Sequence, residues 1–307
     1  MKSVTSAFPT YQNKTALVRV NFDVPFENGQ VEDTTRIEDA VSTIKFLRQN
    51  GCRVILLAHA GRPKGRFDQS ATLAPIIPIL ELLIGEKIGF IQYQTDFTVI
   101  KVSQEPITLL ENLRFWPQEE TNDPEFSLHL AKLADFYVNE AFAVCHRKHA
   151  SIVGIPNYLP SLAGISLEKE ITALSKVRLN PERPLVVVLG GAKMETKLPL
   201  VDAFAPIADH ILVGGKIAIE LQQKPIPANV RLGTLTPDTK DISPESANEF
   251  AAIIMQAKTV VMNGTMGVFE EPEHQQGTKI VAQAVNQTSA FTLIGGGDTE
   301  TALTQFG

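Results

Sequence analysis

Short apolar runs alternate with amphipathic segments along most of the 307 residues. Runs of β-branched and aliphatic residues predict strands at 16–20, 53–58, 136–138, 185–189, 210–213, 259–262 and 290–294. Apolar residues three and four positions apart predict helices at 36–49, 74–83, 127–133 and 244–256. Strands that alternate with helices indicate βαβ units, and therefore parallel sheets with helices on their faces.

The segment SLEKEITALSKVRLNPERP, at 166–184, predicts a helix that joins two such sheets. Ser166 suits the N-cap position, and Pro181 and Pro184 end the helix. A new strand with a glycine turn follows directly. We therefore expect an α/β fold of two doubly wound parallel-sheet (Rossmann-like) domains. The first domain spans 1–165, the connecting helix 166–182 and the second domain 183–307.

Composition and charge narrow the class of protein. Hydrophobic residues make up 44% of the chain and charged residues 20%, so a sizeable core can form. The net charge of −6 disfavours a broad nucleic-acid surface but permits a local basic pocket. Cys52 and Cys145 make neither a disulfide framework nor a zinc motif. With no signal-peptide core and no 18-residue apolar run, we expect a cytoplasmic protein without nucleic-acid or membrane partners. We also expect a monomer.

Four glycine turns follow predicted strands in the second half: LVVVLGGAKMETK (185–197), HILVGGKIA (210–218), VVMNGTMGVFE (260–270) and FTLIGGGD (291–298). The carboxyl ends of parallel strands line one crevice, where glycine lets a phosphate approach the backbone and a helix N-terminus supplies N–H donors. Neither the Walker A pattern nor the dinucleotide fingerprint is present. The turns predict a phosphate-binding edge, or they merely connect strands tightly to helices.

Charged residues on these turns suit a nucleotide. Lys193 and Lys197 are four positions apart, so on a helix they share a face and together suit a polyphosphate. Asp298, followed by Thr299, is either a helix N-cap or a Mg²⁺ ligand beside the phosphates. Glu270 either bonds a ribose hydroxyl or is a solvated surface acid.

Basic groups in the first half follow predicted strands or start helices rather than lining one face. The guanidinium fork of arginine matches carboxylate and phosphate oxygens, so these groups could converge on a small anion. They are otherwise ordinary surface arginines and satisfied histidines. Two polar residues just past the first strand either bond a substrate hydroxyl or serve turn chemistry. The candidates are Asn21, Asp23, Arg36, His59, Arg62, Arg114 and Arg147.

The motifs VRVNFDVP, DTTRI, LLAHAGRPKG, ENLRF, VNEAFAVCHRKHAS, LGGAKMETK, NGTMGVFE and IGGGDT occur in an order that resembles the phosphoglycerate kinases over nearly the whole chain. The resemblance implies a first domain that binds 3-phosphoglycerate or 1,3-bisphosphoglycerate and a second that binds Mg²⁺ with ADP or ATP. It implies domain closure about a hinge and reversible phosphoryl transfer between the two ligands.

The resemblance also assigns roles to residues. It places the acid on the seven candidates of the first half, with Arg36 and Lys197 acting on the transferring phosphoryl group. Asp298 would be the metal contact. The nucleotide set would be Gly190, Gly191, Lys193, Lys197, Glu270, Gly295, Gly296, Gly297, Asp298 and Thr299.

Four departures qualify this resemblance. Asn21 and Asp23 exchange the acid and amide of the usual motif, and Lys216 follows Gly214-Gly215 where the family has a third glycine. That lysine either blocks the nucleotide or points to solvent. The stretch 218–259 is shortened, and Gly307 is not followed by the family's next strand and STGGGAS-type turn. We therefore expect a reduced or truncated second domain. The alternative is a non-catalytic relative that binds the acid or a protein partner without phosphoryl transfer.

Overall fold

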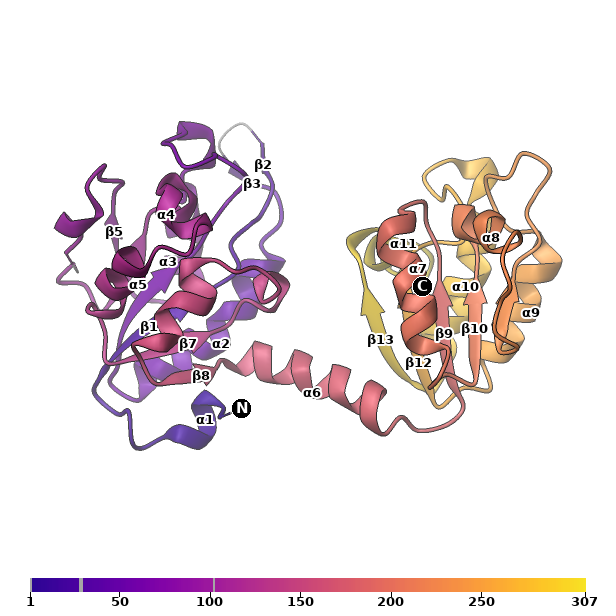
Figure 1. The fold of residues 1–307 in the computed structure, drawn as a ribbon, viewed down its shortest axis with the longest axis horizontal. Helices are drawn as coiled ribbons and strands as arrows, with labels where there is room; N and C mark the ends of the chain where they lie inside the picture. Colours follow the sequence, from indigo (N-terminus) through magenta and orange to yellow (C-terminus); the bar gives the residue numbers. More distant parts are fainter. Residues whose placement is uncertain (1, 28–29, 102) are drawn as a thin grey trace. The chain divides into compact units, whose positions relative to one another are not determined.

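The computed structural model describes residues 2–27, 30–101 and 103–307, and the chain divides into two compact units (Figure 1). Unit 1 spans residues 1–171 and unit 2 spans residues 172–307, so the division falls within helix α6 (Ile165–Leu179). Within the described ranges, no helix is both long enough and apolar enough to cross a membrane.

Unit 1 is built on a six-stranded parallel sheet with the strand order β5-β6-β4-β1-β7-β8. A two-stranded ribbon of β2 (Phe26–Glu27) and β3 (Gln30–Val31) lies outside it. The sheet strands are β1 (Thr15–Arg19), β4 (Arg53–Leu57), β5 (Ile88–Ile91), β6 (Ile107–Leu110), β7 (Phe136–Asn139) and β8 (Ser161–Ala163).

Both faces of this sheet are buried. Ala16 and Val18 pack into a cluster with apolar residues of α2 (Thr35–Gln49) and α3 (Ile77–Ile84). Leu17, on the opposite face, packs with α5 (Pro124–Ala131). A strand covered on both sides gains from apolar residues at every position, which explains the continuous apolar runs of the sequence. Two one-turn helices, α1 (Val4–Ala7) and α4 (Pro117–Glu120), complete the α-helices described in the unit.

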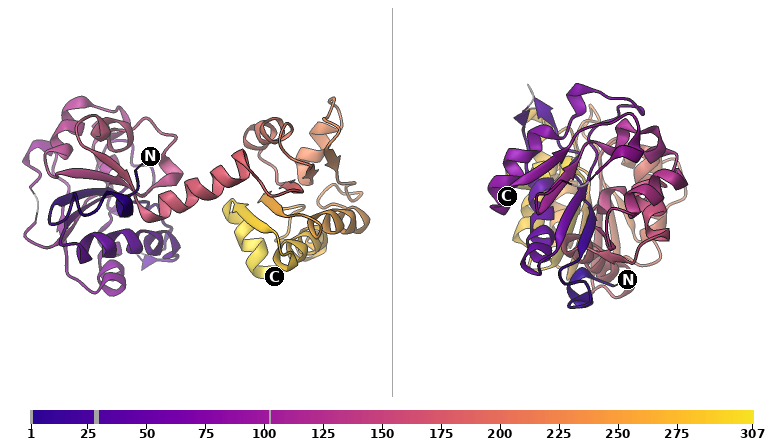
Figure 2. Two further views of the ribbon diagram at one scale, coloured as in Figure 1. Left: turned by 90° about the horizontal axis from the view of Figure 1, so that it is seen from below. Right: turned by 90° about the vertical axis from the view of Figure 1, so that its left-hand side faces the viewer.

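Unit 2 repeats the plan with a five-stranded parallel sheet, in the order β11-β10-β9-β12-β13 (Figures 1 and 2). One face packs against α7 and α8, and the other against α9 and α10 together with Leu303 of α11. The strands are β9 (Leu185–Leu189), β10 (His210–Val213), β11 (Val230–Leu232), β12 (Thr259–Asn263) and β13 (Phe291–Gly295). The helices are α7 (Met194–Phe204), α8 (Gly215–Leu221), α9 (Pro244–Ile254), α10 (Gln276–Gln287) and α11 (Gly297–Phe306).

Helix α6 begins differently from the expectation. Ser166 is not its N-cap, because the helix already starts at Ile165. Its first backbone N–H groups are satisfied from elsewhere: Ile165 donates to Thr43 Oγ1 (2.8 Å), and Ser166 donates to the buried Glu140 carboxylate (3.0 Å). Leu167 N also donates to Glu140 (3.2 Å). A capping carboxylate that is distant in sequence cannot be recognised from the residues next to the helix. The prediction therefore assigned the N-cap to the nearby Ser166.

The predicted fold class is confirmed, and the predicted strands match observed ones to within one or two residues at each end. The two-residue ribbon strands β2 and β3 were not predicted, and neither were β5, β6, β8 and β11 of the two parallel sheets. These four sheet strands have only three or four residues each, and β5 contains Gly89, so their apolar pattern is too short to stand out. The predicted helix at 74–83 divides into a 3₁₀ turn (Ala74–Ile76) followed by α3.

Candidate active site

The sheet of unit 1 reverses its winding between β1 and β7, and this switch point marks the edge where ligands bind in open α/β sheets. The segment after β1 carries Asn21 and Asp23, and the segment after β7 carries Arg147. His59 follows β4, and Arg114 follows β6. Five of the seven predicted acid-binding residues therefore follow the carboxyl ends of four strands in this sheet.

A buried network that the sequence analysis missed lies beneath these residues. Arg19, 1% exposed at the end of β1, donates from Nε to Ser151 Oγ (2.9 Å). Ser151 Oγ donates to Glu119 Oε1 (2.6 Å), and the hydroxyl of Tyr137 donates to the Ser151 carbonyl (2.7 Å). Burial lowers the pKa of Arg19, while the charge of Glu119 opposes that shift. The only signal in the sequence was an arginine inside the apolar run ALVRV.

His59 is held as a neutral ring with one defined tautomer. Arg19 Nη2 lies 3.0 Å from His59 Nδ1, and because a guanidinium can only donate, Nδ1 accepts and Nε2 carries the hydrogen. Burial first, and then the charges of Arg19 and Arg114, lower the pKa of His59 far below its usual range. The Nε2 donor is buried without a hydrogen-bond partner among the described residues, and Asp23 Oδ2 is 3.7 Å away.

Two arginines offer further unused donors. Arg114 is 2% exposed and donates from Nη1 to the Gly61 carbonyl (2.5 Å), while its Nε lies 3.4 Å from Glu120 Oε1. Its Nη2 and the Nε of Arg147 are buried with no hydrogen-bond partner in the described part of the chain. Burial, followed by repulsion from Arg147, lowers the pKa of Arg114. Buried N–H donors on mutually repelling cations fit an anionic ligand that would accept from them.

The remaining candidates of unit 1 are more exposed. The Asp23 carboxylate accepts from Gly61 N (2.9 Å) and so ties the segment after β1 to the segment after β4. Arg36, exposed at the start of α2, donates to the backbone carbonyl of Asp23. Arg62 is exposed, and Asn21 is half-buried. Arg62 follows the same strand as His59, whereas Arg36 belongs to α2.

In unit 2 the winding reverses between β9 and β12, and the turns after these strands pack directly on each other. Gly190 N donates to Asn263 O (3.2 Å), and Gly191 N donates to Thr265 O (2.9 Å). A Cβ on Gly190 would lie 2.1 Å from the Thr265 carbonyl oxygen, and one on Gly264 would lie 2.1 Å from the Gly190 carbonyl oxygen. At both positions turn-to-turn packing excludes a side chain, and Gly264 also has a φ of +107° that favours glycine.

Gly191 and Gly297 differ from those two glycines. A Cβ added at either would meet no described atom within 4 Å. Gly191 has a φ of +93°, which favours glycine on backbone grounds, whereas Gly297 has no such constraint. Open space over these two backbones leaves room for a ligand, so the prediction of a phosphate-binding edge applies here rather than to every glycine of the turns.

The lysine pair is arranged differently from the prediction. The helix begins at Met194, so Lys193 is the N-cap residue and not a member of the helix face. Lys197 is half-buried on α7 and donates from Nζ to the Asn263 side-chain oxygen and to the Asn263 carbonyl (3.3 Å). Burial lowers the pKa of Lys197, the charge of Asp298 opposes this shift, and Lys193 adds to it. Both ammonium groups and the Asp298 carboxylate are thus close enough to interact.

At the last turn the residue before α11 is Gly296, so Asp298 is not the N-cap but the second helical residue. Its carboxylate is exposed. Thr299 is buried, and its hydroxyl accepts from Gly264 N (2.8 Å) and donates to Gly295 O (2.8 Å). Thr299 therefore already serves to join the turns after β12 and β13, while Asp298 is free to face a ligand.

Glu270 and Lys216, the two other residues of unit 2 singled out from the sequence, both have exposed side chains. Glu270 lies past the turn after β12, and no hydrogen bond or ion pair with a described residue engages its side chain. Lys216 is exposed on the first turn of α8, which fits the solvent-facing alternative for this residue.

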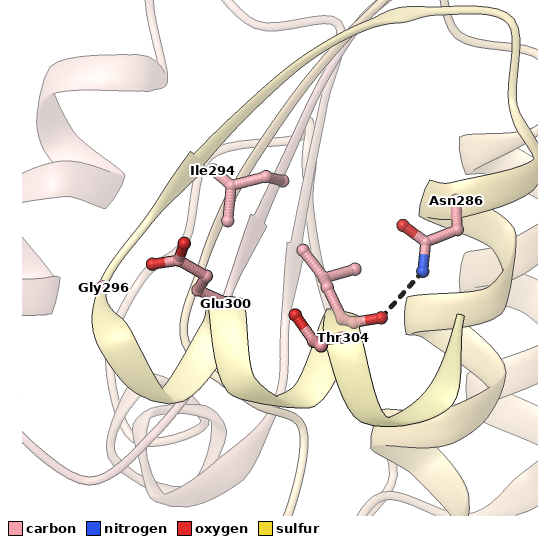
Figure 3. A pocket seen from close by; sticks show the side chains of 6 residues that line it. Asn286, Ile294, Gly296, Glu300 and Thr304 are labelled. Atoms are coloured by element: carbon pink, nitrogen blue, oxygen red, sulfur yellow. Dashed lines mark hydrogen bonds between the residues drawn. The ribbon is translucent and has the colours of Figure 1, made fainter. Parts of the chain in front are cut away.

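A pocket borders the same end of unit 2 but has the wrong chemistry for phosphate (Figure 3). Its lining includes the Glu300 carboxylate and no cationic side chain, and it shares only Gly296 with the predicted nucleotide set. Asn286, on its far side, donates to the Leu303 carbonyl (3.0 Å). We therefore place the candidate phosphate site at Gly191, Lys197 and Gly297 rather than in this pocket.

In a comparison with known protein families, the model of the family described as phosphoglycerate kinase matches residues 7–226 and 235–307 of this chain. The chain belongs to the phosphoglycerate kinase family. A phosphoglycerate kinase from Moorella thermoacetica is 37% identical, and the alignment covers 96% of this chain and 88% of that protein. One from Thermosipho africanus is 38% identical, with 100% and 90% covered.

Solved structures agree with the family assignment. A phosphoglycerate kinase structure from Coxiella burnetii is 30% identical with a TM-score of 0.84, covering 98% of this chain and 90% of that one. One from Pyrococcus horikoshii is 26% identical with a TM-score of 0.83, covering 100% and 91%. The family model breaks at residues 227–234, which contain β11 and lie within the stretch predicted to be shortened.

Proposed function

We propose that this protein catalyses reversible phosphoryl transfer from 1,3-bisphosphoglycerate to ADP, yielding 3-phosphoglycerate and ATP. One observation carries the proposal beyond family membership: the unpartnered buried donors of His59, Arg114 and Arg147 follow strands at the switch-point edge of unit 1. Such donors suit a small organic acid with carboxylate and phosphate oxygens. We also propose that the protein acts as a cytoplasmic monomer without a nucleic-acid partner.

In the acid half-site, His59 Nε2, Arg114 Nη2 and Arg147 Nε donate to the carboxylate and phosphate oxygens. Asn21 and Asp23 bond the substrate hydroxyl, and the exchange of acid and amide between them preserves one donor-capable amide and one acceptor. Arg36 and Arg62 complete the site from the exposed side.

In the nucleotide half-site, phosphates approach the open backbones of Gly191 and Gly297, with Lys193 and Lys197 supplying positive charge. Glu270 bonds a ribose hydroxyl. The exposed Asp298 carboxylate fits Mg²⁺, which in proteins is commonly held by one or two carboxylates together with substrate phosphates. The metal, when bound, neutralises charge on the phosphate oxygens.

In this reaction the residues position the substrates and neutralise charge, and they need not transfer a proton. Phosphoryl transfer spreads negative charge over the equatorial oxygens of the moving group, and cations stabilise that charge. Arg36 and Lys197 take this role, each from its own unit. The leaving group of the acyl phosphate is a carboxylate, which is already stable as an anion, so no general acid is needed. Water must be excluded, since it would otherwise accept the phosphoryl group.

Two binding measurements and one turnover assay test the proposal. Calorimetry should show binding of 3-phosphoglycerate and, separately, of Mg-ADP, and a coupled assay should show ADP release from Mg-ATP that depends on 3-phosphoglycerate. Binding of the acid without Mg-nucleotide would favour the non-catalytic alternative. Absence of turnover from the folded chain would refute the proposal.

A further inference from the structure

A buried histidine in unit 2 joins two loops that lie outside the predicted binding set. His274, whose side chain is 11% exposed, ends a 3₁₀ turn (Pro272–His274) after β12. Its Nε2 lies 2.5 Å from Asp238 Oδ2, and its Nδ1 lies 2.8 Å from Glu271 Oε2. Asp238 belongs to residues 235–242, called here the Asp238 loop. Glu271 belongs to residues 264–271, called here the Glu270 loop.

Only one protonation state satisfies both contacts. Carboxylates accept hydrogen bonds, so both ring nitrogens must donate, and an imidazole donates from both nitrogens only as the imidazolium. The neutral ring would place a lone pair against one carboxylate and lose that hydrogen bond. Burial opposes the charged ring, but the hydrogen bonds to Asp238 and Glu271 outweigh it and raise the pKa of His274 above its usual value.

The surrounding carboxylates act in the same direction, whereas the charge of Lys240 opposes them. The Lys240 ammonium is 2.7 Å from Glu271 Oε2. Glu273, on the same 3₁₀ turn, has a carboxylate oxygen within 4.8 Å of the ligand atoms of His274 and Glu271. Asp241 also interacts with His274. Four carboxylates therefore surround His274 against the single ammonium of Lys240, which favours a proton on His274. Because Lys240 already occupies Glu271 and both imidazole nitrogens are engaged, a proton suits this cluster better than a divalent cation.

The Glu270 loop depends on its contacts with the Asp238 loop. Val268 N donates to the Lys240 carbonyl (2.9 Å), and a Cβ on Gly267 would lie 2.3 Å from the Asp241 carboxylate. Met266 of the same loop donates from its backbone to Thr278 Oγ1 (3.0 Å), and its carbonyl accepts from Gly215 N (3.0 Å). Glu270, the proposed ribose contact, directly precedes Glu271.

We propose that protonated His274 is a positioning residue that clamps the Glu270 loop to the Asp238 loop, so that affinity for the nucleotide falls as pH rises and His274 loses its proton. The inference rests on the proposed nucleotide half-site. Loss of the proton removes one of the two His274 hydrogen bonds and so weakens the connection between the two loops beside Glu270, while Lys240 still pairs with Glu271. Because the pKa of His274 is raised, the clamp is complete below the usual histidine pKa and is lost as pH rises through the raised value.

The test compares Mg-ADP affinity across pH in the wild type and in His274→Gln, which cannot carry the charge. His210→Gln is the matched control, because His210 starts β10 at the opposite edge of the sheet from the glycine turns and is the only other histidine of unit 2. Titration of the nucleotide itself is common to all three proteins and cancels. Nuclear magnetic resonance of the ring protons, assigned by their absence from His274→Gln, measures the His274 pKa directly.

Between about pH 6 and about pH 9, we expect the Kd for Mg-ADP of the wild type and of His210→Gln to rise by about threefold or more relative to that of His274→Gln. Such a change corresponds to part of the free energy of one charge-assisted hydrogen bond. The midpoint should coincide with the His274 titration. Equal pH dependence in all three proteins, or a ring pKa below the usual value, would overturn the clamp while leaving nucleotide binding intact. Absence of Mg-ADP binding at every pH would instead refute the proposed function and the clamp with it.

Discussion

Replacing Arg114 with methionine should separate ligand binding from fold stability. The substitution keeps an unbranched side chain but removes a buried cation whose Nη2 has no hydrogen-bond partner among the described residues. A hydrogen bond from a charged donor contributes about 1.5–3 kcal/mol, so losing one to the acid should raise the Kd for 3-phosphoglycerate roughly 10- to 150-fold.

The cost to the free protein should be much smaller. Methionine gives up the hydrogen bond to the Gly61 carbonyl and the contact with Glu120, which is 43% exposed. It also removes the burial of a charge and the repulsion from Arg147, the two causes that lower the Arg114 pKa most. These changes oppose each other, so the free energy of unfolding should change by about 1 kcal/mol or less in either direction.

Calorimetry with 3-phosphoglycerate and urea unfolding of the free protein measure the two quantities. Arg178→Met is the control, because Arg178 is an exposed residue of α6 outside the site, and both quantities should stay near wild type. Unchanged affinity with a loss of stability above about 2 kcal/mol would show that Arg114 is structural and that its free donor does not meet the ligand.

Three further predictions address the nucleotide turns and the connecting helix. Gly190→Ala should lower the free energy of unfolding by about 2 kcal/mol or more, because its Cβ would lie 2.1 Å from a carbonyl oxygen. Gly297→Ala should leave stability near wild type and weaken Mg-ADP binding. A larger loss of stability in Gly297→Ala than in Gly190→Ala would contradict the assignment. Lys197→Met should lower kcat by about 10²- to 10³-fold. Lys279→Met, on the exposed surface of α10, is the control and should leave kcat unchanged. Equal kcat values in the two variants would show that Lys197 takes no part in the reaction. Burial raises the pKa of Glu140, so the stability of the wild type should fall as pH rises from the unfolded-state pKa through the raised value. Glu140→Gln should remove this part of the pH dependence. Parallel curves of stability against pH for the two proteins would contradict the prediction.

The main features of the fold could be predicted from the sequence because they leave local signals. Continuous apolar strands such as Leu185–Leu189 belong to sheets covered on both faces, and glycine turns fall where those strands end. The residues that follow the strands in unit 1 were predicted for the same reason. Parallel topology brings the carboxyl ends of neighbouring strands to one edge, whatever their separation in the chain.

The features that escaped prediction depend on contacts between distant residues. Arg19 meets Ser151 across 132 positions, and Glu140 caps α6 from 26 positions before it. Thr299 resembled a ligand contact, yet its hydroxyl joins two turns, and Lys193 resembled a helix residue, yet it precedes α7. Such roles follow from packing between segments, so no local pattern records them.

Glycine shows the same division within a single motif. Gly190 and Gly191 are adjacent and looked equivalent, but the first is packed against the turn after β12 and the second faces open space. The sequence correctly predicts that the glycine turns follow the carboxyl ends of the strands, and phosphate binding at this edge stays a prediction. Only the packing shows which backbone a ligand can reach.

Phosphorus magnetic resonance of the protein mixed with Mg-ATP and 3-phosphoglycerate tests the central claim most directly. The proposed function predicts resonances of ADP and of an acyl phosphate that appear together, in equal amounts, and only when the acid is present. Addition of Mg-ADP in excess should reverse the change. Release of inorganic phosphate without acyl phosphate, or an unchanged spectrum from folded protein, would contradict phosphoryl transfer between these two ligands.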